Sequence, residues 1–193
     1  MDMPEEIKSY KVIFVGNTAV GKTHLFNRQW LYLNNKRIVW RRLPKVIQPS
    51  IGVEYAQKNY QLSNNQTVNL LYWDTSGQKR YRQIVSYHQK EAKGVYLVYD
   101  ITKRSTFDEL ENWLNDIKSQ ADKDAVMILI GNKLDKVADN NQPREVSLEE
   151  AQIFAEIHKL IFMEVSTYSN EDIEKCQTRM VEEICNGKLK DSQ

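Results

Sequence analysis

Residues 16–23 read GNTAVGKT, and they follow directly on the apolar run YKVIFV of residues 10–15. Strand-forming residues thus lead into a loop with two glycines, and the lysine and threonine at the end of the loop begin a helical pattern. Together they form the motif G-x-x-x-x-G-K-[ST] in the strand–loop–helix context that the motif requires. The stretch predicts a phosphate-binding loop rather than a glycine-bearing turn without a ligand.

The residue types in this loop each suit a phosphate group. Glycines let the backbone curl so that successive N–H groups point inward at phosphate oxygens, and the ammonium of Lys22 adds a positive charge at the β/γ end. The helix that begins near Lys22 offers the positive end of its dipole. The hydroxyl of Thr23 lies where a phosphate-bound Mg²⁺ is expected.

Composition narrows the class of protein. The chain has 193 residues, of which 41% are apolar and 27% charged, and its formal net charge is +1. These values are typical of a globular protein and argue against disorder and against nucleic-acid binding through bulk charge. Cys176 and Cys185 match no common metal or redox motif, so we expect reduced thiols. Neither a signal peptide nor a membrane-spanning run is evident, and we expect a soluble, cytoplasmic protein.

Apolar runs and helical periods alternate along the chain. Strands are expected at 11–15, 53–62, 67–73, 94–101, 125–130 and 161–165, and helices from 22 to about 33 and at 105–120, 147–158 and 170–184. Ser105 and Ser147 are expected N-caps, the second with Glu150 as its capping-box partner. The alternation predicts an α/β fold whose six-stranded, mostly parallel, doubly wound sheet carries helices on both faces. We expect one domain over 1–187 and a short polar tail at 188–193.

Residues 34–49 form the least regular part of the sequence. They contain two prolines and five basic residues without a clear period, which predicts a long, partly mobile loop. A solvated surface insertion is one interpretation of this segment. A basic and aromatic contact with a partner or a membrane surface is the other, and the sequence leaves both open.

A second motif, WDTSGQ, occupies residues 73–78 at the end of an apolar strand. An aspartate in this position can hold a Mg²⁺-bound water, which is the role expected of Asp74. Gly77 has no side chain, so its N–H can come close to a γ-phosphate. Gln78 is placed to orient an attacking water.

A third motif, NKLD, occupies residues 132–135 after the strand expected at 125–130. The carboxylate of Asp135 can accept hydrogen bonds from the N1–H and the exocyclic amine of guanine. Adenine lacks both donors, and a site built for them rejects a base that leaves the carboxylate unpaired. The tetrapeptide predicts guanine recognition because it follows the other two motifs at the right interval.

With these motifs the chain resembles the small GTPases of the Ras-like superfamily, and within them the Rab branch. Further Rab-like segments are IGVEY at 51–55, VYDIT at 98–102, STF at 105–107 and WL at 113–114. The resemblance covers about residues 9–186. It implies the G domain of the P-loop NTPases: a GTP/GDP switch in vesicle and membrane traffic that binds guanine nucleotide with Mg²⁺, hydrolyses GTP slowly and binds effectors in its GTP state through two switch segments.

Site residues follow from the resemblance position by position. Those implied for nucleotide binding are Asn17, Thr18, Ala19, Val20, Gly21, Lys22, Thr23, His24, Ser50, Gly77, Asn132, Lys133, Asp135, Ser166, Thr167 and Tyr168. Those implied for Mg²⁺ are Thr23, Ser50 and Asp74, and those implied for hydrolysis are Gln78 and Lys22. Effectors, an exchange factor and a GTPase-activating protein are expected at the switch regions, around Tyr55, Trp73 and His88, of a monomeric protein.

Several positions depart from the family pattern. Ser50 stands where the family has threonine, and it lies 27 positions after Thr23 (50 minus 23), a longer interval than usual. The aromatic that covers the guanine is therefore ambiguous between Trp40 and Tyr32. Thr18 and Ala19 occupy places where glycine is frequent, and their side chains crowd the space that an activating arginine enters. We expect slow hydrolysis with weak stimulation.

Other departures affect the base and the effector surface. Tyr168 replaces the lysine that usually flanks the base, and Lys79 replaces an acidic residue. His88 stands where an aromatic usually completes a triad with Tyr55 and Trp73, and we expect an exposed helix residue there rather than a proton-transfer group. His24 and His158 lie in helical patterns without an expected partner.

The last residues contain no prenylation signal, since no cysteine occurs among the final four. We therefore expect contact with endomembranes only if a lipidated tail lies outside this sequence. Two other functions compete with the switch: a nucleotide-holding scaffold with little turnover, and a P-loop nucleoside kinase. A nucleoside kinase would not explain the NKLD motif.

Overall fold

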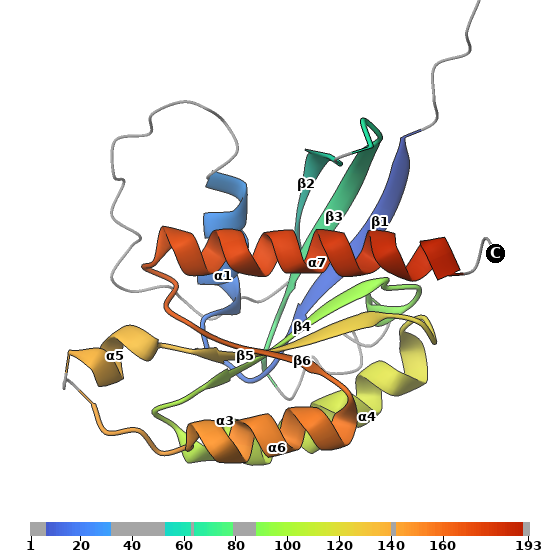
Figure 1. Cartoon of the computed structure of the whole chain (residues 1–193). Helices are drawn as coiled ribbons and strands as arrows, with labels where there is room; N and C mark the ends of the chain where they lie inside the picture. The colour runs from blue at the N-terminus through green and yellow to red at the C-terminus, as the bar shows by residue number, and fades with distance from the viewer. Residues whose placement is uncertain (1–6, 32–52, 63, 79–87, 140–141, 191–193) are drawn as a thin grey trace, which may run out of the picture.

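The computed structural model describes residues 7–31, 53–62, 64–78, 88–139 and 142–190. Figure 1 shows strands and helices alternating along the chain, as the sequence predicts. In chain order the elements are β1 (Lys8–Val15), α1 (Lys22–Leu31), β2 (Val53–Gln61), β3 (Thr67–Thr75), β4 (Gly94–Asp100), α3 (Arg104–Asp108), α4 (Leu110–Gln120), β5 (Val126–Asn132), α5 (Leu134–Ala138), α6 (Leu148–His158), β6 (Ile161–Val165) and α7 (Asn170–Lys190).

The six strands form one sheet in the order β2-β3-β1-β4-β5-β6. Only β2 and β3 pair antiparallel, as a hairpin, and the other four pairs are parallel. This confirms the predicted α/β class and the mostly parallel sheet. The chain passes from β1 to β3 on one side of the sheet and to β4 on the other, so the strand order reverses direction at β1. The carboxyl end of β1 is therefore the place where a doubly wound sheet opens a ligand crevice.

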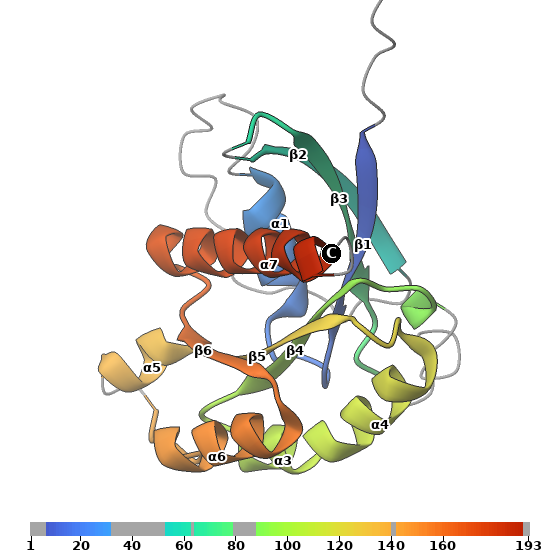
Figure 2. The same ribbon diagram turned by 45° about the vertical axis from the view of Figure 1, so that its right-hand side comes forward.

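Successive side chains of β1 enter two different hydrophobic cores, because a strand directs alternate residues to opposite faces. Val12 and Phe14 belong to the core on the face of α1 and α7. Ile13 and Val15 belong to the core on the face of α3, α4 and α6. Figures 1 and 2 show these two groups of helices on opposite sides of the sheet. The last four residues of the strand that leads into the phosphate-binding motif are thus fully buried.

The helix predicted for 105–120 is wrong in two respects. It is broken at Glu109, which ends α3 and precedes α4. Ser105 is not its N-cap, since α3 begins at Arg104 after the extended residue Lys103, and no side chain of the cap residue bonds to the helix. The N–H of Arg104 instead donates to the carboxylate of Glu145 at 2.6 Å. A residue far along the chain therefore satisfies this helix end, and the local sequence gives no sign of it.

Other predicted boundaries hold more closely. The N–H of Glu150 donates to the hydroxyl of Ser147 at 3.1 Å, which confirms the predicted N-cap of α6. The carboxylate of Glu150 pairs with Arg104 rather than completing the capping box. Helix α7 continues beyond the predicted end to Lys190, and α5 is a short helix that the sequence did not reveal. Both cysteines are present as thiols, as expected. The segment 34–49 lies outside the described residues.

Candidate functional site

The phosphate-binding motif forms a tight loop between β1 and α1. Gly21 has a φ of +106°, and a Cβ on it would lie 2.1 Å from Nδ2 of Asn132. A side chain is excluded at this position by the backbone conformation and by the guanine motif packed against it. The carbonyl of Val20 accepts a hydrogen bond from the same Nδ2 at 2.8 Å. The first and third motifs of the sequence thus meet in one place.

The side chain of Lys22 turns back over this loop. Its Nζ donates to the carbonyl oxygens of Gly16 at 2.9 Å and Asn17 at 2.8 Å, and the residue is only 5% exposed. Burial lowers the pKa of Lys22 to about 8, although the nearby carboxylate of Asp74 acts in the opposite direction. Burying an ammonium among mainly neutral partners costs free energy. An anion that binds at the loop therefore interacts favourably with this charge.

Thr23 and Asp74 come together although 51 positions separate them (74 minus 23). The hydroxyl of Thr23 donates to Oδ2 of Asp74 at 2.6 Å. Asp74 lies near the carboxyl end of β3 and is fully buried. Hydroxyl and carboxylate oxygens are the ligands that Mg²⁺ prefers, alongside phosphate oxygens and water. This pair, next to Lys22, has the donor types and the position for a phosphate-bound Mg²⁺.

Gly77, in the second motif, packs against the phosphate loop. A Cβ on it would lie 2.4 Å from the carbonyl carbon of Asn17 and 2.5 Å from the nitrogen of Thr18. Only glycine lets the second motif come so near the loop. Gln78 follows at the end of the described segment, half-buried, with its N–H donating to the hydroxyl of Ser76 at 3.4 Å.

The two segments that the sequence assigns to the base also meet. The hydroxyl of Ser166 donates to Oδ1 of Asp135 at 2.6 Å, across 31 positions of the chain (166 minus 135). This contact orients the carboxylate that the sequence predicts to recognise guanine. Ser166 and Thr167 are 7% and 5% exposed, whereas Tyr168 is 62% exposed. Tyr168 therefore offers little enclosure for a base in this arrangement.

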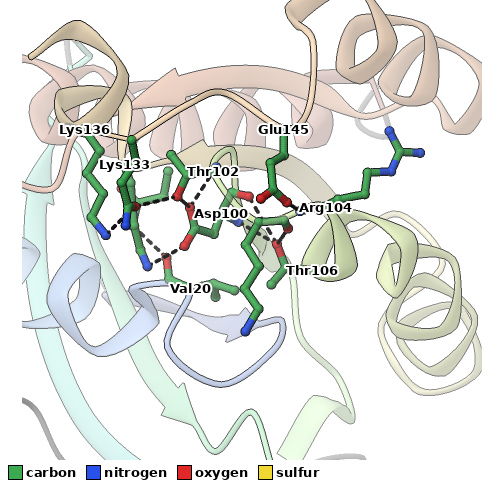
Figure 3. A network of polar contacts seen from close by, with 11 residues as sticks. Val20, Asp100, Thr102, Arg104, Thr106, Lys133, Lys136 and Glu145 are labelled. Carbon is green, nitrogen blue, oxygen red and sulfur yellow. Dashed lines mark hydrogen bonds and ion pairs between the residues drawn. The ribbon is translucent and has the colours of Figure 1, made fainter. Parts of the chain in front are cut away.

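Lys133 lies in the left-handed region, with a φ of 76°, between Asn132 and the short helix α5. Its Nζ forms an ion pair of 2.5 Å with Oδ2 of Asp100, at the carboxyl end of β4. Figure 3 shows this pair inside a larger polar network that joins β4, α3 and the segment after β5. Asp100 and Asn132 are register partners in the sheet, which brings Lys133, the residue after Asn132, within reach of Asp100.

Three residues that the sequence does not predict for the site form hydrogen bonds with its surroundings. Nε1 of Trp113, on α4, donates to Oδ1 of Asn17 at 2.5 Å. Arg28, on α1, donates to the side chain of Asn170 and, at 3.4 Å, to the carbonyl of Tyr168. The N–H of Ser166 donates to Asp172 at 2.8 Å. The only sequence signal for any of them is that Trp113 belongs to a Rab-like segment.

Histidines differ from the expectation. His88 is half-buried and its ring lies 5.5 Å from that of Trp73, so the expected exposed residue is wrong. His158 was expected to lack a partner, but its ring lies 4.4 Å from Phe154. Burial and the nearby ammonium of Lys133 lower the pKa of His24, which keeps the imidazole neutral near pH 7.

Four residues of the sequence prediction lie outside the described residues: Ser50, Lys79 and both aromatic candidates, Trp40 and Tyr32.

Comparison with known proteins decides the family. Residues 11–186 match the family model described as the Ras family. The chain belongs to this family of small GTPases. A Ras-related protein Rab11A of Lotus japonicus is 39% identical over 180 residues, covering 92% of this chain and 72% of the relative. Ras-related protein RABA6b of Arabidopsis thaliana is 35% identical, covering 91% and 70%. Ras-related protein Rab-11C of Dictyostelium discoideum is 32% identical, covering 94% and 76%.

The protein is therefore a small GTPase of the Rab branch, a switch of membrane traffic. Members of this family bind guanine nucleotide, generally with Mg²⁺, and interact with effectors, exchange factors and GTPase-activating proteins, and Rab relatives act on endomembranes. Among the described helices, none combines the length and the apolar character needed to cross a bilayer.

The aromatic residues predicted for effectors lie together in this GTPase. Tyr55 and Trp73 are register partners on β2 and β3, with ring centroids 5.1 Å apart. His88 adds a third ring, 5.5 Å from that of Trp73, and Nζ of Lys11 lies 5.1 Å from the Trp73 ring. Tyr55 is 51% exposed. The result is a partly exposed aromatic surface beside the motif that ends at Gln78.

Replacing Ala19 by glycine is expected to stabilise this GTPase. Ala19 is exposed and has a φ of +65°, a conformation that costs roughly 1–2 kcal/mol in a residue with a Cβ. Glycine's larger unfolded-state entropy offsets part of this gain, so we expect a net increase of about 0.5–1 kcal/mol and a melting temperature about 1–4 °C higher. Thermal unfolding measures the shift. Ala121→Gly, at an extended residue with φ −70°, is the matched control and is expected to destabilise.

The lowered pKa of Lys22 predicts that nucleotide binding depends on pH. Its pKa of about 8 in the free protein lies below the ordinary value, so Lys22 holds its proton below pH 8 and loses it above. Phosphate oxygens favour the charged form, and above pH 8 binding must therefore take up a proton. GDP affinity is expected to be level between about pH 7 and 8 and to fall, by at most about tenfold per pH unit, between about 8 and 9. Fluorescent-GDP titrations measure it, and a fall equally steep in Lys22→Met would contradict this origin.

Proposed function

We propose that this Rab-branch GTPase is a slow GTP/GDP switch that binds guanine nucleotide between the phosphate loop and the 132–135 and 166–168 segments, and binds effectors in its GTP state. One observation carries the proposal: the 2.8 Å hydrogen bond from Nδ2 of Asn132 to the carbonyl of Val20. It joins the segment that reads the base to the loop that holds phosphates. A nucleotide, which carries a base and phosphates in one molecule, suits two such adjoining segments.

The proposed Mg²⁺ site uses this chain's own oxygens. Thr23 supplies a hydroxyl ligand and Asp74 acts through water, supported by their 2.6 Å contact next to Lys22. Ser50 is proposed as the second hydroxyl ligand. A bound Mg²⁺ supplies charge neutralisation on the phosphates. Lys22 adds its own positive charge, and its low free-state pKa favours pairing with an anion.

Hydrolysis in the proposed function depends on Gln78, which orients the attacking water, and on Gly77, whose N–H contacts the γ-phosphate. The approach of Gly77 to within van der Waals distance of the loop supports this role, since no side chain fits between them. Thr18 and Ala19 are proposed to slow turnover, because their side chains occupy the rim that an activating arginine must cross. The left-handed Ala19 supports the idea that the loop keeps a glycine-like shape without glycine there.

Partners are proposed at the aromatic surface of Tyr55, Trp73 and His88. The ring contacts of 5.1 and 5.5 Å support it as one continuous apolar patch. Effectors that insert aliphatic or aromatic side chains suit such a patch. We also propose a monomer that acts in the cytoplasm and reaches endomembranes when a lipidated tail is present. The competing proposal is a scaffold that holds nucleotide and hardly cycles.

Gln78→Leu is expected to slow single-turnover GTP hydrolysis at least about tenfold, since the attacking water loses one hydrogen bond in the transition state. The GTP-loaded protein is mixed with Mg²⁺ and phosphate release is followed. Gln152→Leu, an exposed glutamine of α6, is the matched control and is expected to hydrolyse GTP at the wild-type rate.

The same assay separates the switch from the scaffold. Equal, near-zero rates in wild type and Gln78→Leu favour the scaffold. A variant with glycine at both 18 and 19 is expected to hydrolyse GTP severalfold faster than wild type if those side chains slow turnover. An unchanged rate in that variant contradicts their role, whatever Gln78→Leu does.

A further inference from the structure

Asp100 is a buried carboxylate that the proposed mechanism does not use. It is the last residue of β4, and its side chain is 7% exposed. Such a carboxylate is costly unless every oxygen has a good partner. Oδ1 accepts hydrogen bonds from the N–H of Thr102 at 3.0 Å and from its hydroxyl at 2.7 Å. Oδ2 lies 2.5 Å from Nζ of Lys133.

This ion pair determines where the Lys133 side chain lies. Lys133 has a long, flexible stem, and its side chain is only 21% exposed. Its backbone is in the left-handed region, which a lysine adopts only when its surroundings hold it there. Oδ2 of Asp100 is the anionic partner of its ammonium in the described part of the chain. The stem of Lys133 is therefore anchored at both ends.

A second connection ties the same segment to β4. Nζ of Lys136, on α5, donates to Oε1 of Gln142 at 2.9 Å, and the hydroxyl of Thr102 lies 3.1 Å from that oxygen. Thr102 in turn contacts Asp100. Figure 3 shows Lys133, Lys136, Thr102 and Asp100 gathered around one centre. The residues that follow β5 are thus connected to Asp100 directly through Lys133 and indirectly through Lys136.

We propose that Asp100 is a positioning residue for the guanine nucleotide: it holds Lys133 in place before the base arrives. This inference rests on the proposed function, in which Lys133 belongs to the guanine site. Anchoring a flexible side chain in advance removes part of the ordering cost of binding. Loss of the Asp100 charge frees Lys133 and speeds release of the nucleotide. A merely structural Asp100, which only shapes the turn after β4, acts on release without involving Lys133.

A double-mutant cycle on the whole chain described here tests the idea. Proteins are loaded with a fluorescent GDP, and its release is followed after excess GDP is added, for wild type, Asp100→Asn, Lys133→Met and the double variant. We expect release about fivefold faster in Asp100→Asn, and no further acceleration when this change is added to Lys133→Met. Asp122→Asn is the matched control, because it breaks another 2.5 Å aspartate–lysine pair, with Lys93, away from the site. Its release rate is expected to stay at the wild-type value.

Two results overturn the inference: release from Asp100→Asn within twofold of wild type, or the full acceleration by Asp100→Asn repeated in the Lys133→Met background. If Asp100→Asn does not fold, Thr102→Val replaces it in the same cycle. It removes the hydroxyl that orients Asp100 and keeps the charge, and a smaller acceleration that again disappears with Lys133→Met is expected. Wild-type protein that cannot be loaded with the fluorescent GDP overturns the proposed function itself, whereas additive variants of a protein that loads well overturn only the role of Asp100.

Discussion

Asp135→Asn is expected to change the preferred base from guanine to xanthine, lowering affinity for GDP by roughly 10⁴-fold. The carboxylate of Asp135 can accept from both donors of guanine, the N1–H and the exocyclic amine. An amide keeps one acceptor and turns the other oxygen into a donor, which then faces the amine of guanine. Xanthine carries a carbonyl oxygen in place of that amine, so the amide pairs with it. Competition between GDP and xanthosine diphosphate measures the preference.

The structure indicates that this substitution leaves the contact that supports residue 135 in place. Oδ1 of Asp135 accepts the hydroxyl of Ser166 at 2.6 Å, and the carbonyl oxygen of an asparagine can keep that bond. The substitution therefore alters the group that faces the base and leaves its support in place. Asp139→Asn, at an exposed position just after α5, is the control and is expected to leave the preference unchanged. An Asp135→Asn protein that still prefers GDP contradicts base recognition by this carboxylate.

Lys22→Met is expected to weaken GDP binding by roughly 10²–10³-fold, because the phosphates lose a buried, charged hydrogen-bond donor. The free protein is expected to lose no stability. Burial lowers the pKa of Lys22 to about 8, so the ammonium that Lys22 carries at neutral pH costs free energy in the folded, free protein relative to the unfolded chain. Replacing a buried charge by an apolar side chain of similar length is often neutral or stabilising. Isothermal titration gives the affinity and thermal unfolding gives the stability.

Weaker binding without a loss of stability is the combination that makes the experiment specific. A residue that only supports the loop loses stability and affinity together. Lys175→Met removes an exposed lysine of α7 that pairs with Glu171, and is expected to change neither quantity. GDP affinity within threefold of wild type in Lys22→Met contradicts the phosphate role of Lys22.

Much of the candidate site could be predicted from the sequence because its residue types are required locally. A loop that wraps phosphates needs glycine at fixed places, and a guanine-reading segment needs a carboxylate after a strand. Gly21, Gly77 and Asp135 satisfy such demands wherever the chain places them. The predicted strands and their mostly parallel order follow from similar local signals, namely buried apolar runs that alternate with helical periods.

Other features depend on residues that meet only after folding. The start of α3 is satisfied by Glu145, 41 positions away, and the predicted cap at Ser105 fails for that reason. His88 reads as an exposed helix residue until β3 brings Trp73 to its ring. Neither contact has a local sequence signature, because each involves ordinary residue types whose partners lie on other elements.

The sequence by itself determined that this chain is a mostly parallel α/β GTPase, and it predicts a phosphate loop and a guanine-reading segment, since the residues of each motif are adjacent in the chain. Only the tertiary structure decided how the motifs support one another. The hydrogen bond from Asn132 to Val20, the contact of Ser166 with Asp135 and the pairing of Lys133 with Asp100 all depend on the strand order of the sheet. That order brings the carboxyl ends of β1, β4, β5 and β6 to one edge, and no single stretch of the chain encodes it.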